Sequence, residues 1–276
     1  MKIAVIGCGL MGKGIIQSFA VNGYKVIAVK HRENDNSFEP YLRNELDKKR
    51  INEEDYDTVL GNVVFTADIK ETADCDIVIE TIVEDLEKKR ELLEKLDKIC
   101  KPEAILASNT SGLSIKSLAE ATERKEKVIG MHFMSPVPVM RLVEIIRSEY
   151  TSQETFDIVS DITKKIDKDG VAVKDSPCFI TSRLIAVYMH EAFRMYEEGV
   201  GSAEDIDYIA KEGLGFPIGP LRLADALGVD VVLKVMENLS ENIDKRYTPC
   251  ELLKTMVESG KTGKKSGEGF YTYKKK

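Results

Sequence analysis

The stretch Ile3-Ala-Val-Ile-Gly-Cys-Gly-Leu-Met-Gly12 decides the fold of this chain. Its first four residues form a short apolar run, which is typical of a buried strand. Three glycines follow with G-x-G-x-x-G spacing: Gly7, Gly9 and Gly12. The first permits a tight turn, the second lets a pyrophosphate approach the backbone, and the third lets helix and strand pack closely. A helix-compatible stretch begins with Leu10 and Met11 and runs to Val21, so the pattern predicts a dinucleotide site at a helix N-terminus.

Strand-like apolar runs then alternate with helical segments along the first part of the chain. The runs are Ile3–Ile6, Lys25–Val29, Val63–Phe65, Ile77–Ile79, Ile105–Ala107 and Lys127–Met131. This alternation predicts βαβ units and an α/β fold of the Rossmann type, with a doubly wound, mainly parallel sheet. Two further runs, Leu142–Ile146 and Gly170–Val173, flank a helical segment at Glu154–Ile166 and could extend the sheet.

Two features divide the chain further. A charged, helix-prone stretch at about residues 38–60 replaces the expected single crossover helix and predicts a helical excursion from the sheet. After Asp175-Ser-Pro177 the strand pattern ceases until Gly269-Phe-Tyr-Thr-Tyr273. Pro177 is placed to begin a helix, and Phe179–Tyr196 is apolar on nearly every face. We therefore expect a dinucleotide-binding domain at 1–175 and an all-helical domain at 176–276. Its segments Ala203–Lys211, Leu221–Leu239 and Glu251–Ser259 carry no strand pattern.

Composition excludes several classes of function. The 276 residues carry a formal net charge of −7 with no basic stripe, so a nucleic-acid partner is not expected. No apolar stretch approaches ~18 residues, which argues against a membrane span. Five dispersed cysteines fit neither a metal site nor a disulfide framework. With no apparent leader, these features predict a cytoplasmic protein without a metal.

Three segments are expected at the ligand edge of the sheet, outside the carboxyl ends of its strands. They are Thr81–Asp85, Ser108–Ser111 and His132–Pro136. His132 alone among the three histidines is so placed, and a histidine there can take an alcohol's proton while a hydride leaves. The alternative is an ordinary buried histidine. Glu144 follows on the next strand-like run, where it could orient the imidazole or could be a charge on the rim.

Several sequence blocks, spread in order over nearly the whole chain, resemble the short-chain L-3-hydroxyacyl-CoA dehydrogenases, and most closely the bacterial 3-hydroxybutyryl-CoA dehydrogenases. The blocks are Gly7-Cys-Gly-Leu-Met-Gly12, Glu80-Thr-Ile-Val-Glu-Asp-Leu86, Ala107-Ser-Asn-Thr-Ser111, Gly130-Met-His-Phe-Met-Ser-Pro-Val-Pro-Val-Met140 and Gly263-Lys-Lys-Ser-Gly-Glu-Gly-Phe-Tyr271. The resemblance implies a reversible hydride transfer between C3 of an acyl-CoA thioester and a nicotinamide. It also implies a homodimer formed through the helical domain.

The resemblance assigns roles by position. His132 matches the catalytic histidine and Glu144 the carboxylate that orients it. Ser111 matches a serine that hydrogen-bonds the substrate's 3-oxygen, although local turn capping is an alternative role for it. Residues around the nicotinamide and its ribose are matched by Glu84, Lys89 and Asn109.

The chain departs from the family pattern at the end of its second strand. An aspartate that binds the ribose 2′-hydroxyl is usual there, but this chain has Lys30-His31-Arg32. Lys30 and Arg32 would attract a 2′-phosphate, so we expect NADP(H) to be favoured, with NAD(H) possible. A solvated cation pair on a loose loop is the alternative interpretation.

Other departures concern the substrate. Ser135 and Ser182 stand where the family has asparagines, the second of which helps to hold the substrate, and Cys178 replaces a glycine. In the family the helical excursion contributes to coenzyme A binding, which makes Lys49 and Arg50, with Arg43 and Lys48, candidate phosphate partners or simply a solvated basic face. Two other functions stay open: a dehydrogenase of a non-thioester hydroxy acid, and a nucleotide-binding protein without turnover.

Overall fold

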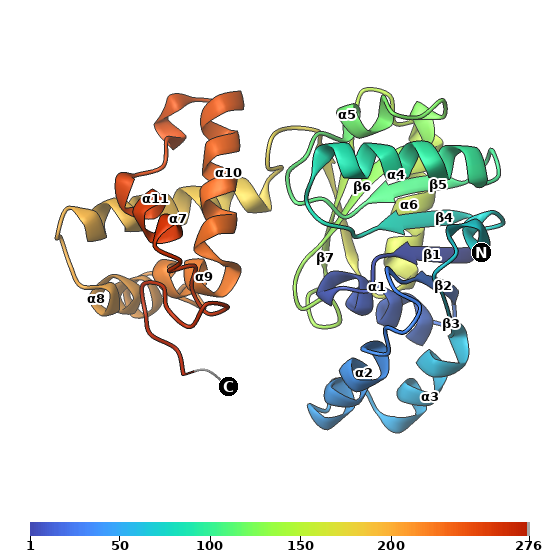
Figure 1. Cartoon of the computed structure of the whole chain (residues 1–276), viewed down its shortest axis with the longest axis horizontal. Helices are drawn as coiled ribbons and strands as arrows, with labels where there is room; N and C mark the ends of the chain where they lie inside the picture. The colour runs from blue at the N-terminus through green and yellow to red at the C-terminus, as the bar shows by residue number, and fades with distance from the viewer. Residues whose placement is uncertain (275–276) are drawn as a thin grey trace. The chain divides into compact units, whose positions relative to one another are not determined.

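The computed structural model describes residues 1–274. The chain forms two compact units, residues 1–175 and 176–276, and each has its own hydrophobic core. The larger unit holds all the strands of the sheet, and the smaller unit is built from helices (Figure 1).

The sheet of the first unit has eight strands in the order β3-β2-β1-β4-β5-β6-β7-β8. Their bounds are β1 Lys2–Ile6, β2 Lys25–Val29, β3 Val63–Thr66, β4 Ile77–Glu80, β5 Ile105–Ser108, β6 Val128–Phe133, β7 Leu142–Arg147 and β8 Asp169–Lys174. All neighbouring strands are parallel except β6 and β7. The inner strands are buried along their length, as their continuous apolar runs require.

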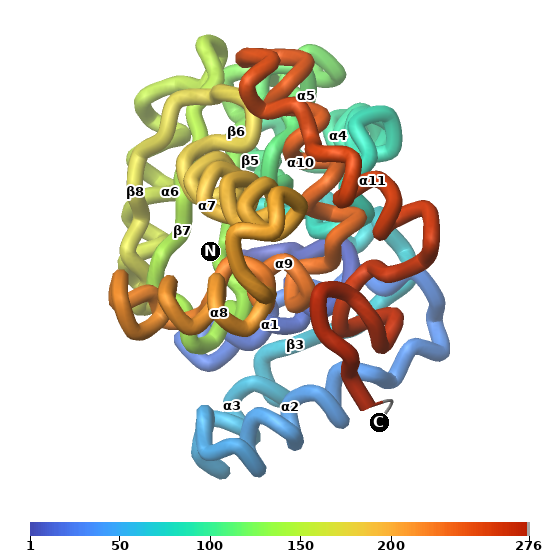
Figure 2. Tube along the Cα trace, turned by 90° about the vertical axis from the view of Figure 1, so that its left-hand side faces the viewer, coloured from blue at the N-terminus to red at the C-terminus, as the bar shows by residue number. Residues whose placement is uncertain are grey.

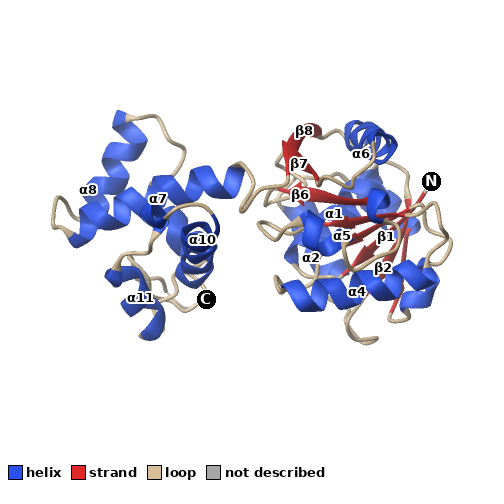
Figure 3. Cartoon of the chain, turned by 90° about the horizontal axis from the view of Figure 1, so that it is seen from above, coloured by secondary structure: helices blue, strands red, loops and turns tan. Residues whose placement is uncertain are grey.

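Helices cover both faces of this sheet, with α4 on one face and α6 on the other (Figure 3). The helices of the sheet unit are α1 Leu10–Val21, α4 Leu86–Ile99, α5 Ile115–Ala119 and α6 Gln153–Lys165, with 3₁₀ turns at Ile69–Thr72 and Lys125–Lys127. Side-chain caps define the starts of α4 and α6: Asp85 accepts from the Lys88 amide at α4, and Ser152 accepts from the Thr155 amide at α6. The predicted α/β fold class is confirmed.

The helical excursion lies between β2 and β3. It consists of α2 (Phe38–Asp47) and α3 (Glu53–Asn62), which lie side by side next to β3 (Figure 2). Asn52 and Asp55 form a capping box that starts α3. Phe38, Leu42 and Tyr56 anchor the pair to the core of the unit.

The second unit is helical, as expected, but its first helix begins later than predicted. Its helices are α7 Thr181–Glu197, α8 Ala203–Tyr208, α9 Pro220–Leu227, α10 Val229–Asn242 and α11 Glu251–Glu258, with a π-helical turn at Ile209–Gly213 and a 3₁₀ turn at Lys245–Tyr247. The prediction that a helix begins at Pro177 is wrong, because Cys178 and Phe179 adopt positive φ angles of 61° and 50° and α7 begins only at Thr181. The strand-free segment Leu221–Leu239 holds two helices, because Gly228, with φ of 104°, separates α9 from α10.

Within residues 1–274, no helix combines the length and apolar character needed to cross a bilayer. The same residues contain no group of three or more His, Cys, Asp or Glu side chains arranged to hold a metal ion.

Candidate active site

The glycine turn between β1 and α1 has the shape that a dinucleotide needs. Gly7 has a φ of 99°, and a Cβ on Gly12 would lie 1.9 Å from the Gly7 carbonyl oxygen, so neither position accepts a side chain. A Cβ on Gly9 would meet nothing within 4 Å, which leaves its backbone open to an approaching group. The first turn of α1 has no side-chain cap and no acidic residue, so its amides and dipole suit a pyrophosphate. Leu10 and Met11 form this first turn, and Leu10 is exposed.

His132 and Glu144 lie together at the carboxyl end of β6. They are directly opposed in the antiparallel β6–β7 pair, and His132 Nδ1 is 2.7 Å from Glu144 Oε2. His132 is 8% exposed and Glu144 only 2%, so Glu144 is not a charge on the rim. A buried carboxylate against Nδ1 fixes the imidazole's orientation and stabilises its protonated form.

The loops that follow β4 and β5 bring three more predicted residues to the same edge. Glu84 Oε1 accepts hydrogen bonds from the Ser111 amide at 2.9 Å and the Ser111 hydroxyl at 3.1 Å. Asn109 Oδ1 accepts from the Phe133 amide at 2.9 Å, which ties the β5 loop to the strand end beside His132. Because β1, β4, β5 and β6 are parallel neighbours, their carboxyl ends and the glycine turn share one edge of the sheet.

Lys89 lies beneath this edge rather than on it. Its side chain is 1% exposed, and Nζ is 2.8 Å from each carboxylate oxygen of Glu80 and 3.5 Å from Glu84 Oε2. The hydroxyl of Ser108 also donates to Glu80. The pairing of Glu80 with Lys89 and Ser108 was not predicted from the sequence, where the available signal was a glutamate ending an otherwise apolar strand.

Lys30 and Arg32, the cations that follow β2, differ in their contacts with the loop. Lys30 Nζ donates to the carbonyl oxygens of Glu33 at 2.6 Å and Asp35 at 3.0 Å, and lies 5.7 Å from the ring centroid of Phe65. Arg32 is exposed on the same loop. Lys30 is therefore held by the loop and is not a loosely solvated side chain.

The arm formed by α2 and α3 separates the four candidate coenzyme A contacts into two groups. Arg50 makes a two-oxygen ion pair with the buried Glu45, at 3.0 and 3.1 Å. Arg43 packs over the ring of Tyr56 and donates to its hydroxyl. Both arginines therefore support the arm's own fold, whereas Lys48 and Lys49 are exposed.

The serines that replace family asparagines lie in different units. Ser135 is in the connection between β6 and β7, and Ser182 is in the first turn of α7. Cys178, just before α7, is 2% exposed, and its Sγ donates to the Val235 carbonyl at 3.9 Å. Its positive φ occurs where the family pattern has a glycine, which is the residue that adopts this conformation most readily.

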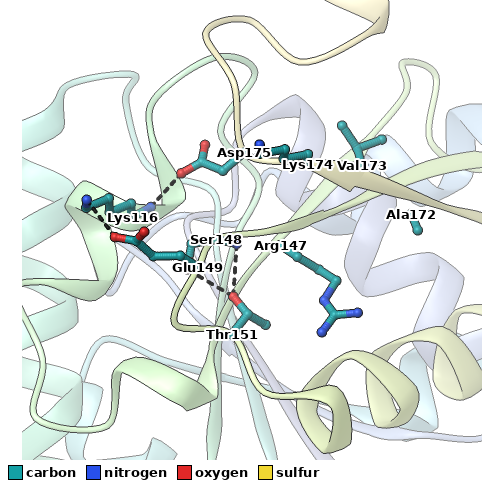
Figure 4. A pocket seen from close by; sticks show the side chains of 9 residues that line it. All are labelled: Lys116, Arg147, Ser148, Glu149, Thr151, Ala172, Val173, Lys174 and Asp175. Carbon is teal, nitrogen blue, oxygen red and sulfur yellow. Dashed lines mark hydrogen bonds and ion pairs between the residues drawn. The ribbon is translucent and has the colours of Figure 1, made fainter.

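A cavity of about 500 Å³ opens at the other end of the sheet, beside the ends of β7 and β8 (Figure 4). Since β7 runs antiparallel to β6, these strand ends lie away from His132. Lys116 in its wall is paired with Glu149 at 2.6 Å, and Asp175 accepts from the Lys116 amide. The cavity is therefore not part of the candidate site.

A Rossmann sheet with an open glycine turn and a His–Glu pair at one edge defines a nicotinamide-dependent dehydrogenase. Comparison with known proteins supports this class of protein. Residues 2–176 match the family model for the 3-hydroxyacyl-CoA dehydrogenase NAD binding domain, and residues 179–273 match the C-terminal domain of the same family. The chain belongs to the 3-hydroxyacyl-CoA dehydrogenase family, whose members are oxidoreductases acting on a hydroxyl group.

Individual relatives match over the whole length. A probable 3-hydroxybutyryl-CoA dehydrogenase of Deinococcus radiodurans is 43% identical over 279 residues, covering 99% of this chain and 100% of the relative. The 3-hydroxybutyryl-CoA dehydrogenase of Clostridioides difficile is 41% identical, with 100% of both chains covered. The crystal structure of (S)-3-hydroxybutyryl-CoA dehydrogenase from Ralstonia eutropha superposes with a TM-score of 0.94 at 38% identity, covering 99% of each chain.

Proposed function

We propose that this chain is a 3-hydroxybutyryl-CoA dehydrogenase that interconverts the 3-hydroxyacyl and 3-oxoacyl thioesters. The observation that carries the proposal is the 2.7 Å contact between His132 and Glu144 at the sheet edge that also holds the glycine turn. The names of full-length relatives supply the four-carbon acyl-CoA substrate.

In this mechanism a bound nicotinamide supplies or accepts the hydride at C3 of the substrate. His132 uses Nε2 to take the proton from the 3-hydroxyl group in the oxidation, or to return it in the reduction. Glu144, bound to Nδ1, stabilises the imidazolium that forms. The Ser111 hydroxyl, which lies 3.1 Å from Glu84, can turn its proton toward the 3-oxygen and favour the developing negative charge there.

The residues around the cofactor support a preference for NADP(H). Lys30 is held at the end of β2 by two carbonyl oxygens, and Arg32 follows it on the exposed loop. A 2′-phosphate placed there gains an ion pair with these cations in addition to hydrogen bonds, whereas a neutral 2′-hydroxyl gains no ion pair.

The preference can be measured as kcat/KM with NADPH and with NADH. The double variant Lys30→Ala/Arg32→Ala should lose about 10-fold or more in kcat/KM for NADPH and little for NADH, the size expected for one or two such hydrogen bonds. Lys25→Ala, at the other end of the same strand, is the control. Equal or better use of NADH by the unmodified chain would contradict the preference.

We assign substrate contacts to Ser182 and to Lys49 of the arm, with Arg50 acting through the arm's structure.

A homodimer through the second unit is supported by the apolar side chains that this unit exposes, including Leu184, Val187, Leu214 and Phe216. Sedimentation of the purified chain tests the dimer. A cytoplasmic location remains the expectation from the dispersed cysteines.

Parallel assays of reduced-cofactor oxidation with acetoacetyl-CoA and with free acetoacetate test the substrate. Turnover with the thioester that falls by about 10²–10⁴-fold in His132→Gln, with cofactor affinity retained, is the expected result. Turnover with the free acid alone would favour the non-thioester alternative. Cofactor binding without turnover of either would favour a nucleotide-binding protein.

A further inference from the structure

The connection between β6 and β7 joins the strands that carry His132 and Glu144. It spans residues 134–141 and lies outside the ladder of the sheet. Its centre is a tight turn in which the amides of Val139 and Met140 both donate to the Pro136 carbonyl oxygen. The conformation of this turn fixes where β7 begins and hence which residue faces His132, because a one-residue slip would move every side chain of β7 to the other face.

A buried lysine holds this turn from a distant part of the sequence. Lys168, directly before β8, is 6% exposed, and its Nζ donates to the carbonyl oxygens of Val137 at 2.6 Å and Met140 at 2.9 Å. Burial lowers the pKa of this ammonium. Both hydrogen bonds recorded for it within residues 1–274 go to main-chain carbonyl oxygens of the turn.

The nearby acidic groups are engaged elsewhere. Arg141 forms exposed ion pairs with Asp167 and Asp169, both at 2.9 Å. The Lys168 ammonium therefore binds the carbonyl oxygens of the turn and, among the described residues, does not form a surface ion pair. A buried ammonium is costly unless it is hydrogen-bonded, and a buried carbonyl oxygen likewise needs a donor, so the lysine and the turn depend on each other.

The other side of the turn is closed by α1. Val137 is 3% exposed, and a Cβ added to Gly14 of α1 would lie 2.7 Å from the Cβ of Val137. The turn is thus held between a close contact with the cofactor-binding helix and the ammonium of Lys168. Without the lysine, the contact with α1 is the one of these two restraints that remains.

We propose that Lys168 is a positioning residue for the His132–Glu144 pair: it fixes the β6–β7 turn and so holds the carboxylate against the imidazole. The inference rests on the proposed function for its kinetic consequence, but its structural consequence can be measured without substrate.

The test compares Lys168→Met, which keeps the apolar stem and removes the donors, with Lys168→Arg and Lys168→Gln, which keep donors. Lys165→Met changes an exposed lysine on α6 and serves as the matched control. The first measurement is the proton NMR signal of the imidazole Nδ1–H hydrogen-bonded to Glu144, assigned by its loss in His132→Gln. The second is kcat with acetoacetyl-CoA, together with the dissociation constant of the reduced cofactor.

We expect Lys168→Met to lose or broaden the imidazole signal and to lower kcat by about 10-fold or more, the size of one lost buried hydrogen-bonded donor. Cofactor affinity should change less than 3-fold, and Lys168→Arg should recover part of both losses. If Lys168→Met does not fold, Lys168→Gln replaces it, and its signal should lie between the unmodified chain and His132→Gln.

An unchanged signal and a kcat within 2-fold of the unmodified value in a folded Lys168→Met or Lys168→Gln variant would overturn the inference. If the unmodified chain shows no turnover, the proposed function fails. The NMR comparison still decides the role of Lys168 in that case.

Discussion

His132 and Glu144 occupy directly opposed positions on β6 and β7, and 2.7 Å separates the imidazole Nδ1 from the carboxylate Oε2. This pair lies in the one antiparallel step of the sheet. Because β7 runs antiparallel to β6, Glu144 lies near the start of β7 at the carboxyl edge of the sheet. In a strand parallel to β6, the same position would lie near the opposite edge. The direction of β7 therefore matters to the chemistry as well as to the topology.

Replacement of Glu144 by Gln should reduce kcat by about 10²–10⁴-fold, because an amide cannot stabilise the imidazolium and can present the wrong group to Nδ1. Cofactor affinity should remain within a few fold, since the glycine turn is untouched. Steady-state kinetics with a parallel cofactor titration measure both quantities. A kcat within 2-fold of the unmodified value would show that the carboxylate is not needed.

The two neighbouring cations of the arm should respond differently to removal. Arg50→Ala leaves the buried Glu45 without its partner and should cost roughly 1–3 kcal/mol of unfolding free energy. Lys49→Ala should leave stability unchanged within about 0.5 kcal/mol and raise KM for acetoacetyl-CoA. Urea denaturation and kinetics on both variants separate the effects. A lower stability in Lys49→Ala than in Arg50→Ala would reverse this assignment.

Lys89 should act chiefly on stability. Lys89→Met leaves Glu80, which is fully buried, as an unpaired charge and should lower the unfolding free energy by about 3–5 kcal/mol. Lys88→Met, at the exposed neighbouring position, is the control. The double variant Glu80→Gln/Lys89→Met should recover part of the loss, because it removes the charge that was left buried. Equal denaturation midpoints for the two single variants would refute the argument.

His190 of α7 should make stability depend on pH. Burial lowers the pKa of this imidazole below its usual value of 6.5, and the residue is 9% exposed. As the pH falls through 6.5, the unfolded chain binds a proton before the folded chain does, so the unfolding free energy falls. His190→Gln should reduce this slope, which is at most about 1.4 kcal/mol per pH unit for one proton. Urea denaturation at several pH values measures the slope, and an unchanged slope in His190→Gln would contradict the prediction.

Local patterns were sufficient to predict the sheet unit. The helix predicted at Leu10–Val21 has those bounds in the structure, since the glycine turn fixes its start and the apolar period its length. Strands β4 and β6 extend one and two residues beyond their predicted ends, to Glu80 and Phe133. The strands continue past their apolar runs because their backbones still pair with neighbouring strands there. The apolar pattern of one segment does not indicate how far such pairing extends.

Long-range contacts were not predictable in the same way. From the sequence, Arg50 is interpreted as a phosphate partner or a solvated cation, and no local pattern draws attention to Lys168. Only packing shows that Lys168 binds a turn about thirty residues earlier and that Arg50 pairs with a buried glutamate. The start of α7 was missed because Cys178 and Phe179 adopt backbone angles that their residue types rarely favour. The chemical roles of His132, Ser111 and the other site residues remain predictions that the experiments above address.

The hairpin of β6 and β7 also bears on how such an enzyme can change its substrate. His132 and Glu144 are only twelve residues apart, so little loop-closure entropy opposes their meeting, and both lie in the same unit as the glycine turn. In the proposed function, proton exchange and nucleotide binding are thus encoded within a single unit. Divergence elsewhere in the chain can then change which alcohol is accepted while this unit is inherited intact.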